Sequence, residues 1–278
     1  MKKELIKTIP LQRACKWALI AGAYSCLPLL KSYVAFIRFP HVSSGLSAVL
    51  SITLALLIGF RINQSYDRWW EARKLWGTLV NVSRNLAVKI RELQRPDLAD
   101  RQVARNVIVA FCVGLKDHLR DEPDLNKLPG FEAVKATPHH MPSFIVRRLY
   151  EMFEKWKIEG QLSDERLWVL DAEARLLLDV CGACERIKNT LMSISWRSFT
   201  WHCIIVLLLV LPWGLVDDFG VLTIPMTILY SYFVIAGEFI AQIVEAPFGR
   251  QEDNLDLEGI CRNIDRSVSE VLLDHPQE

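Results

Sequence analysis

The chain has 278 residues, of which 51% are hydrophobic, and its formal net charge is +1. The hydrophobic fraction is only slightly above that of soluble proteins, so the average composition does not separate a soluble protein from a membrane protein. With a charge this close to neutral we expect no nucleic-acid partner. The order of the residues is more informative, because several long stretches contain no Asp, Glu, Lys or Arg.

The first candidate membrane span is short and interrupted. Trp17–Leu30 is apolar, Lys31 interrupts it, and Ser32–Ile37 resumes it. Because Pro28 lies inside the apolar stretch, we expect a tilted or kinked helix there.

The second candidate span is longer and continues beyond its apolar part. Phe39–Phe60 is an uncharged run of 22 residues, enough for a helix to cross the hydrocarbon core of a bilayer. Charged residues begin at Arg61, and no Pro or Gly occurs before Gly77. We therefore expect one helix that crosses the membrane and extends to about residue 93.

Two rows of residues distinguish the faces of this helix, because residues four apart share a face. One row is small, which allows close helix approach in lipid, and the row beside it is bulky. The spacing alone fits best an ordinary bundle helix with a small-residue seam. The alternative is a ring of identical helices whose bulky rows point into a shared central space. The small row is Ser43, Ser47, Ser51, Ala55 and Gly59, and the row beside it grows from Ala48 through the bulky residues Ile52, Leu56 and Phe60.

The middle of the chain predicts further helices rather than membrane spans. An apolar stripe over about 101–120 indicates an amphipathic helix with Asp100 as its cap. Another helix is expected over about 144–158. Ser163 then caps a long helix that ends near residue 190, with acids in its first turn.

Two pairs of potential metal ligands occur in this region, and we expect neither to bind a metal. His139 and His140 lie in a proline-rich stretch, 121–143, which predicts a solvated loop. Cys181 and Cys184 have CxxC spacing but lack further ligands nearby, so helix packing is the better interpretation.

The last two candidate spans form a predicted hairpin. Residues 198–216 and 219–237 are uncharged runs of 19 residues each, separated by Asp217 and Asp218. Beyond the hairpin, an amphipathic helix is expected to end near Leu273. No strand pattern occurs, so the predicted fold class is all-α, with four transmembrane helices and a large cytoplasmic helical region.

Basic residues set the predicted orientation. Lys2, Lys3, Lys7, Arg13 and Lys16 precede the first span, and residues 61–197 are rich in Lys and Arg. The positive-inside rule places both termini and the middle region in the cytoplasm, in a multi-pass protein of the plasma (inner) membrane. The short connections at Arg38–His41 and Asp217-Asp218 would lie outside. The predicted divisions are an N-terminal segment with two spans (1–62), a cytoplasmic helical region (63–197), a transmembrane hairpin (198–245) and a cytoplasmic C-terminal segment (246–278).

Five motifs are spread over nearly the whole chain. They are Gly59-Phe60-Arg61, the run Ser65–Gly77 with Arg68, Trp69, Trp70 and Glu71, then Leu162-Ser163-Asp164, Cys184-Glu185-Arg186, and Glu245-Ala246 followed by Pro247, Phe248 and Gly249. In this order they resemble the bestrophin family, especially its prokaryotic members. The most specific parts of the resemblance are the Arg-Trp-Trp-Glu motif and the Pro-Phe-Gly turn.

This resemblance implies a homopentamer with a central ion pore. The second span would line a narrow neck, with rings of Ile52, Leu56 and Phe60, the residues that the spacing had separated. We therefore prefer the pore-lining role, with the small row packing around the pore. Narrow apolar rings can gate by dewetting and offer no ligand to a dehydrated ion.

Two positions depart from the family pattern that the resemblance implies. Glu165 falls at a second constriction, the cytoplasmic exit, where relatives commonly have an apolar residue. Five copies would form an anionic ring that favours cations, but an acid in a first helical turn is also explained by the helix dipole. The acids that correspond to a calcium site in animal members are sparse, so Glu252, Asp253 and Asp256 are only weak calcium candidates.

The sequence therefore predicts a homopentameric bestrophin-type channel with a hydrophobic neck for small monovalent ions. Chloride is the family default, and a sodium or potassium channel is the alternative. An alternative from another class is a membrane-embedded sensory or scaffold protein with a cytoplasmic partner. No catalytic motif occurs, so we expect no enzyme, catalytic residue, cofactor or resident metal. The expected partners are further copies of the chain, the lipid bilayer and the permeating ions.

Overall fold

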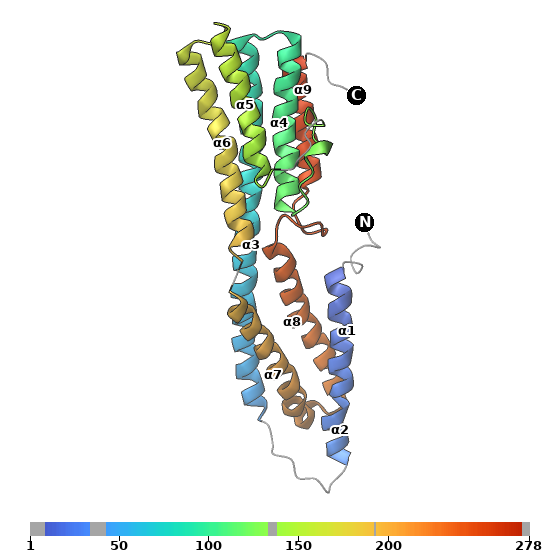
Figure 1. The fold of residues 1–278 in the computed structure, drawn as a ribbon. Coiled ribbons are helices and arrows are strands. Elements are labelled where there is room, and N and C mark those ends of the chain that lie inside the picture. The colour runs from blue at the N-terminus through green and yellow to red at the C-terminus, as the bar shows by residue number, and fades with distance from the viewer. Residues whose placement is uncertain (1–8, 34–42, 133–137, 192, 274–278) are drawn as a thin grey trace. The chain divides into compact units, whose positions relative to one another are not determined.

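The computed structural model describes residues 9–33, 43–132, 138–191 and 193–273, and the regular secondary structure in this part of the chain is entirely helical (Figure 1). The all-α prediction is therefore confirmed. Lys2, Lys3, Lys7 and the Arg38–His41 connection lie outside the described residues. The chain forms two compact units: unit 1 comprises 1–69, 191–246 and 251–253, and unit 2 comprises 70–190, 247–250 and 254–278.

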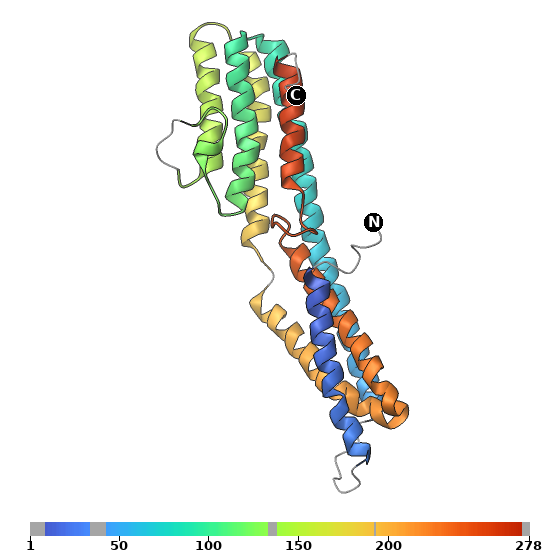
Figure 2. The same ribbon diagram turned by 90° about the vertical axis from the view of Figure 1, so that its right-hand side faces the viewer.

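Unit 1 contains the apolar helices. Helix α1 packs along α8, and α7 packs against α8 (Figures 1 and 2). Its core includes Leu54, Ile58, Ile204, Leu207 and Val234. The elements are α1 (Ile9–Tyr24), α2 (Cys26–Tyr33), the first part of α3 (Ser44–Lys89), α7 (Ile194–Phe219), η3 (Gly220–Leu222) and α8 (Thr223–Glu245).

Two helical stretches among the described residues are long and apolar enough to cross a membrane. They are Gly45–Gln94 and Ile194–Glu245, the second of which comprises α7, η3 and α8. The turn between α7 and α8 lies at Gly220–Leu222, so the prediction that Asp217 and Asp218 form the connection was wrong by a few residues. The two aspartates occupy the last turn of α7 instead.

The kink expected in the first span is present as a break between α1 and α2. Helix α1 ends at Tyr24, four residues before Pro28. A proline lacks the N–H that would bond to this residue, and its ring clashes with the carbonyl four residues earlier. The Ser25 hydroxyl donates to the Gly22 carbonyl at 2.6 Å and stabilises the break.

Unit 2 is a bundle of amphipathic helices in which α4 lies between α5 and α9 (Figures 1 and 2). Its core contains the buried side chains of Trp76, Phe111, Phe153 and Trp156. The elements are the rest of α3, a π-helical turn η1 (Ile90–Gln94), α4 (Leu98–Leu119), η2 (Leu125–Lys127), α5 (Met141–Ile158), α6 (Asp164–Asn189) and α9 (Leu257–Leu273).

Most helix boundaries lie where the sequence predicted them, but the N-cap of α4 was assigned to the wrong aspartate. Helix α3 is unbroken over 46 residues, as predicted, and Ser163 caps α6 by accepting from the Arg166 N–H. Asp97, rather than Asp100, caps α4. Asp100 was misassigned because its side chain instead accepts from Trp156 and Lys155 of α5, which a local pattern does not show.

The two loop histidines have different environments. His139 is exposed, as expected. His140 is not merely solvated: it is the N-cap of α5, and its Nδ1 accepts from the Ser143 N–H at 3.2 Å. The expectation of a solvated pair was therefore wrong for His140.

Candidate functional site

The predicted neck residues lie on the surface of the chain. Ile52, Leu56 and Phe60 are 64%, 59% and 62% exposed, whereas Leu54 and Ile58 of the same helix are buried in the core of unit 1. An α-helix turns by about 100° per residue, so the three exposed side chains point about 120–160° away from the core-facing pair. The bulky apolar row therefore lies exposed on the surface of the folded chain.

The small-residue row is divided between the interior and the surface. Ser47 is buried beside Gly214 of α7, where an added Cβ would lie 3.1 Å from the Ser47 Cβ. Ser51 is half-buried, and Ala55 is exposed. Gly59 has no atom within 4 Å of the position that a Cβ would take. The row therefore permits close α3–α7 packing at one end and stays open at the other.

Directly after the predicted neck residues, α3 carries a buried charge network that was not predicted from the sequence. Nε of Arg61 lies 3.1 Å from a Glu238 carboxylate oxygen, and Nη2 lies 2.8 Å from Glu245; all three side chains are at most 1% exposed. Arg197 adds a second cation 3.3 Å from Glu245, and Gln242 donates to Glu238. Two arginines thus balance two glutamates, as buried charges require.

A sequence signal for this network did exist. Arg61 directly follows one uncharged run, and Glu238 directly follows another, on the side of the membrane where both runs were predicted to end. Charges at the ends of apolar helices usually pair with one another or face a functional path. The two residues have opposite charges at similar predicted depths in the membrane. An ion pair between Arg61 and Glu238 could therefore have been predicted from the sequence.

The first half of the Arg-Trp-Trp-Glu motif binds backbone carbonyls within unit 1. The Arg68 Nε donates to the Glu245 carbonyl at 3.2 Å, and the Trp69 indole N–H donates to the Asp253 carbonyl at 3.2 Å. Arg68 therefore holds the C-terminal end of α8, and Trp69 holds the chain that follows α8.

The second half of the motif belongs to unit 2 and meets another of the family-like motifs. Trp70 is exposed, and Glu71 forms an ion pair with Arg186 at 2.5 Å. Arg186 belongs to the Cys184-Glu185-Arg186 triplet on α6. The two sequence motifs are thus joined through one ion pair between α3 and α6.

The Pro-Phe-Gly turn is held by an arginine that lies far away in the sequence. Arg120, at the end of α4, donates to the carbonyls of Phe248 and Gly249 at 3.0 Å each and pairs with Glu258 of α9. Phe248 is buried, and Pro247 precedes it at the start of the turn. The hydrogen bond from Arg120 outweighs burial and lowers the pKa of Glu258.

Of the three weak calcium candidates after this turn, Asp256 has a structural role. Asp256 accepts from the Gly259 N–H at 2.8 Å and so caps the first turn of α9, as the capping alternative expected. Glu252 and Asp253 have exposed side chains.

Glu165 lies in the first turn of α6 and is exposed. Hydrogen bonds from its own backbone N–H and from Ser163 lower the pKa of Glu165, so the carboxylate is ionised at neutral pH. The neighbouring Asp164 instead pairs with Lys157 at 2.9 Å. Trp168, one turn further along α6, is also exposed. The exposed end of α6 thus presents a carboxylate next to an aromatic ring.

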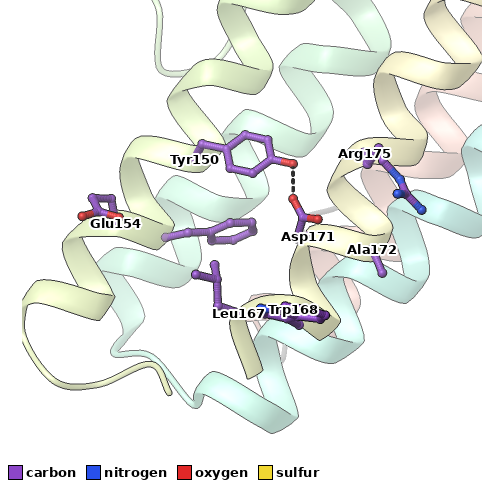
Figure 3. Close-up of a pocket in the computed structure, with 8 residues that line it drawn as sticks. Tyr150, Glu154, Leu167, Trp168, Asp171, Ala172 and Arg175 are labelled. Carbon is purple, nitrogen blue, oxygen red and sulfur yellow. Dashed lines mark hydrogen bonds between the residues drawn. The ribbon is translucent and has the colours of Figure 1, made fainter. Parts of the chain in front are cut away.

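A cleft of about 510 Å³ lies between α5 and α6 beside Trp168 (Figure 3). The Tyr150 hydroxyl donates to Asp171 across it at 2.7 Å, and Arg175 lies further along α6. Burial, and then the hydrogen bond to Asp171, raise the pKa of Tyr150 to about 12. The phenol therefore stays protonated and joins the two helices.

Cys181 and Cys184 are buried in the packed face of α6, which agrees with the packing interpretation. Burial raises the pKa of each thiol to about 12, so neither provides a reactive thiolate at neutral pH.

Long apolar helices with a balanced buried charge network, joined to an amphipathic helical bundle, indicate the class of all-helical membrane proteins. The chain belongs to the bestrophin family: the family described as bacterial/fungal bestrophin protein matches residues 11–270. This confirms the resemblance found in the sequence.

Individual relatives agree with the family match. The chain is 31% identical over 234 residues to a voltage-dependent anion channel-forming protein of Mesorhizobium japonicum, covering 82% of this chain and 75% of the relative. It is 32% identical over 240 residues to a protein of the same description from Ralstonia nicotianae, covering 84% and 78%. A crystal structure of a bacterial bestrophin homologue from Klebsiella pneumoniae has the same fold, with a TM-score of 0.84 and 24% identity over 93% of this chain and 98% of that one.

Family membership and the descriptions of these relatives indicate a channel rather than an enzyme. They also imply that the chain resides in a membrane.

Proposed function

We propose that the chain is the subunit of an anion-conducting channel in which five copies surround a central path. The support for anions is that the curated relatives are described as voltage-dependent anion channel-forming proteins. Chloride, as an abundant small monovalent anion, is the proposed principal permeant ion.

The observation that carries this proposal is the outward-facing apolar row on α3. Ile52, Leu56 and Phe60 are exposed in the chain although they belong to a helix long enough to span a bilayer. Five copies of this row around an axis form stacked apolar rings, which expel water when narrow. Ala55 and Gly59, exposed beside the row, leave room for a neighbouring α3 to approach closely.

The proposed topology has four spans: α1 with α2, then α3, α7 and α8. Both termini and the amphipathic helices lie on the cytoplasmic side of the inner membrane, where Lys and Arg accumulate. Intact-mass measurement of the detergent-solubilised complex tests the pentamer, and a complex of any other number of chains contradicts it.

Ion flux tests the neck. The purified protein in liposomes should conduct, and Leu56→Ala should raise the conductance because a wider apolar ring is easier to hydrate. Leu229→Ala is the matched control, since Leu229 of α8 is similarly exposed at 54% but lies outside the proposed neck. An unchanged conductance in a folded Leu56→Ala protein, or an equal rise in both variants, would contradict the neck.

The second candidate function is a monovalent cation channel, and Glu165 favours it. Its ionised carboxylate lies at the exposed start of α6, where five copies would form an anionic ring. Reversal potentials under a potassium chloride gradient separate the two functions. If cations permeate, Glu165→Gln should reduce their preference over chloride, whereas Asp164→Asn, which removes an acid already paired with Lys157, should change it less. Anion preference in the unaltered channel rejects this candidate.

An absence of flux from correctly assembled protein would favour the third possibility, a membrane-embedded sensory or scaffold protein. A stable complex with a cytoplasmic partner would then be expected.

A further inference from the structure

Three potential metal ligands from three helices of unit 2 converge on one point. They are His118 in the last turn of α4, His140 at the N-cap of α5, and Glu185 of α6. The Nε2 atoms of His118 and His140 lie 2.6 Å and 2.9 Å from the same Glu185 oxygen, Oε1. The centroids of the two imidazole rings lie 5.0 Å apart, and the ring planes are tilted by 59°. All three potential ligand atoms lie within 4.8 Å of one another.

We propose that His118, His140 and Glu185 form a binding site for a divalent transition-metal ion, with zinc as the best fit. Two imidazole nitrogens and one carboxylate oxygen are a usual three-residue ligand set for zinc, which completes its tetrahedral coordination with water or another ligand. The chemistry also accepts nickel or cobalt, whereas calcium and magnesium prefer oxygen ligands. The proposed site is independent of ion conduction.

Access and charge support the site. The three side chains are partly exposed, so an ion from solution can reach them. The nearest cations on α6 have partners elsewhere: Arg186 pairs with Glu71, and Lys188 pairs with Asp121. The negative charge of Glu185 therefore remains directed at the two histidines.

Glu185 is also placed to act as a ligand. Its Oε1 is the carboxylate oxygen that lies within hydrogen-bonding distance of both imidazole Nε2 atoms. A bound metal ion would place a single dication where the two imidazole Nε2 atoms now approach Oε1, so the carboxylate would stay paired with positive charge.

Metal binding should break a hydrogen bond at the start of α5 and change hydrogen exchange there. His140 uses Nδ1 to accept from the Ser143 N–H, so its ring proton now belongs on Nε2. A metal ion on Nε2 moves that proton to Nδ1, because a neutral ring carries one proton and one free nitrogen. The cap hydrogen bond is then lost, and the Ser143 amide should exchange its hydrogen faster although the site as a whole becomes more rigid.

The alternative is a hydrogen-bonded contact between three helices that never holds an ion. Tag-free, full-length protein in detergent is treated with EDTA, freed of the chelator and titrated with zinc chloride, with bound zinc measured by calorimetry and elemental analysis. We expect one high-affinity zinc per chain, faster exchange at Ser143, and a higher unfolding temperature. No binding, or binding that leaves both α5 exchange and thermal stability unchanged, rejects the site.

Two variants identify the ligands. His140→Gln keeps a polar side chain but not the imidazole, and His139→Gln is the matched control because its side chain is exposed one residue away. Since losing the hydrogen-bond partner of a ligand already weakens binding about 10- to 100-fold, losing a ligand should weaken it at least about 100-fold. His139→Gln should bind as the parent does. If His140→Gln unfolds, X-ray absorption of the zinc-loaded parent decides instead: two imidazoles and one carboxylate support the site, and any other ligand set rejects it.

Discussion

The two units of the chain distribute apolar and charged side chains in opposite ways. Unit 1 exposes bulky apolar side chains such as Leu56 and Phe233, and buries Arg61 and Glu238 completely. Unit 2 has a core of buried aromatic side chains that includes Trp76 and Phe111, and most of its ion pairs are at least partly exposed. A water-facing bundle stabilises itself through its apolar interior. Unit 1 instead places apolar groups where lipid or a neighbouring chain can contact them and pairs its charges internally.

The largest expected effect comes from breaking the buried network of unit 1. Arg61→Ala leaves Glu238 and Glu245 without their main counter-charge, which should destabilise the protein by about 3–5 kcal/mol. Arg147→Ala is the comparison from unit 2, because Arg147 is 71% exposed and its pairing with Glu151 is worth about 0.3–0.5 kcal/mol. Thermal unfolding in detergent measures both; similar unfolding temperatures for the two variants would refute the contrast.

The second prediction compares a Phe→Ala substitution in unit 2 with one in unit 1. Phe111→Ala opens a cavity in the core of unit 2 and should cost about 3–4 kcal/mol. Phe233→Ala removes a side chain that is 64% exposed on α8 and should change stability by only about 0.5 kcal/mol in detergent. The same unfolding assay applies, and a large loss in Phe233→Ala would show that unit 1 has an interior contact there.

The smallest expected effect concerns pH and the contact between Arg120 and Glu258. The pKa of Glu258 is lowered in the folded protein, so the pairing contributes fully above the ordinary carboxyl pKa and is lost as the pH falls through the lower folded value. Because Glu258 is partly exposed, we expect a contribution of at most about 1 kcal/mol. The protection of α9 against hydrogen exchange, expressed relative to the intrinsic exchange rate at each pH, should therefore fall in acid, and Glu258→Gln should show a weaker dependence. An identical pH profile in the variant would contradict this assignment.

The sequence was sufficient for features encoded locally. The uninterrupted α3, the Ser163 cap of α6, the kink caused by Pro28 and the end of α9 near Leu273 each depend on residues within a few positions of one another. Helical spacing also separated the row of Ile52, Leu56 and Phe60 from the small-residue row, although spacing alone favoured an ordinary bundle helix.

Features that join distant segments were not predicted. Asp100 looked like a cap because its partners, Lys155 and Trp156, lie more than fifty positions away. His140 was assigned to a solvated loop because nothing near it in the sequence indicates His118 or Glu185. Such contacts are set by tertiary packing, which overrides local preference.

The pairing of α4 with α9 has a consequence for biosynthesis. Ile264 and Val268 of α9 are fully buried, and α9 packs on α4, yet α9 leaves the ribosome only after both α7 and α8 have been made. The nascent bundle therefore lacks the contact of α9 on α4 until the apolar helices α7 and α8 have been synthesised. During that interval the incomplete bundle exposes apolar surface of α4, to which chaperones can bind. A longer interval should increase aggregation.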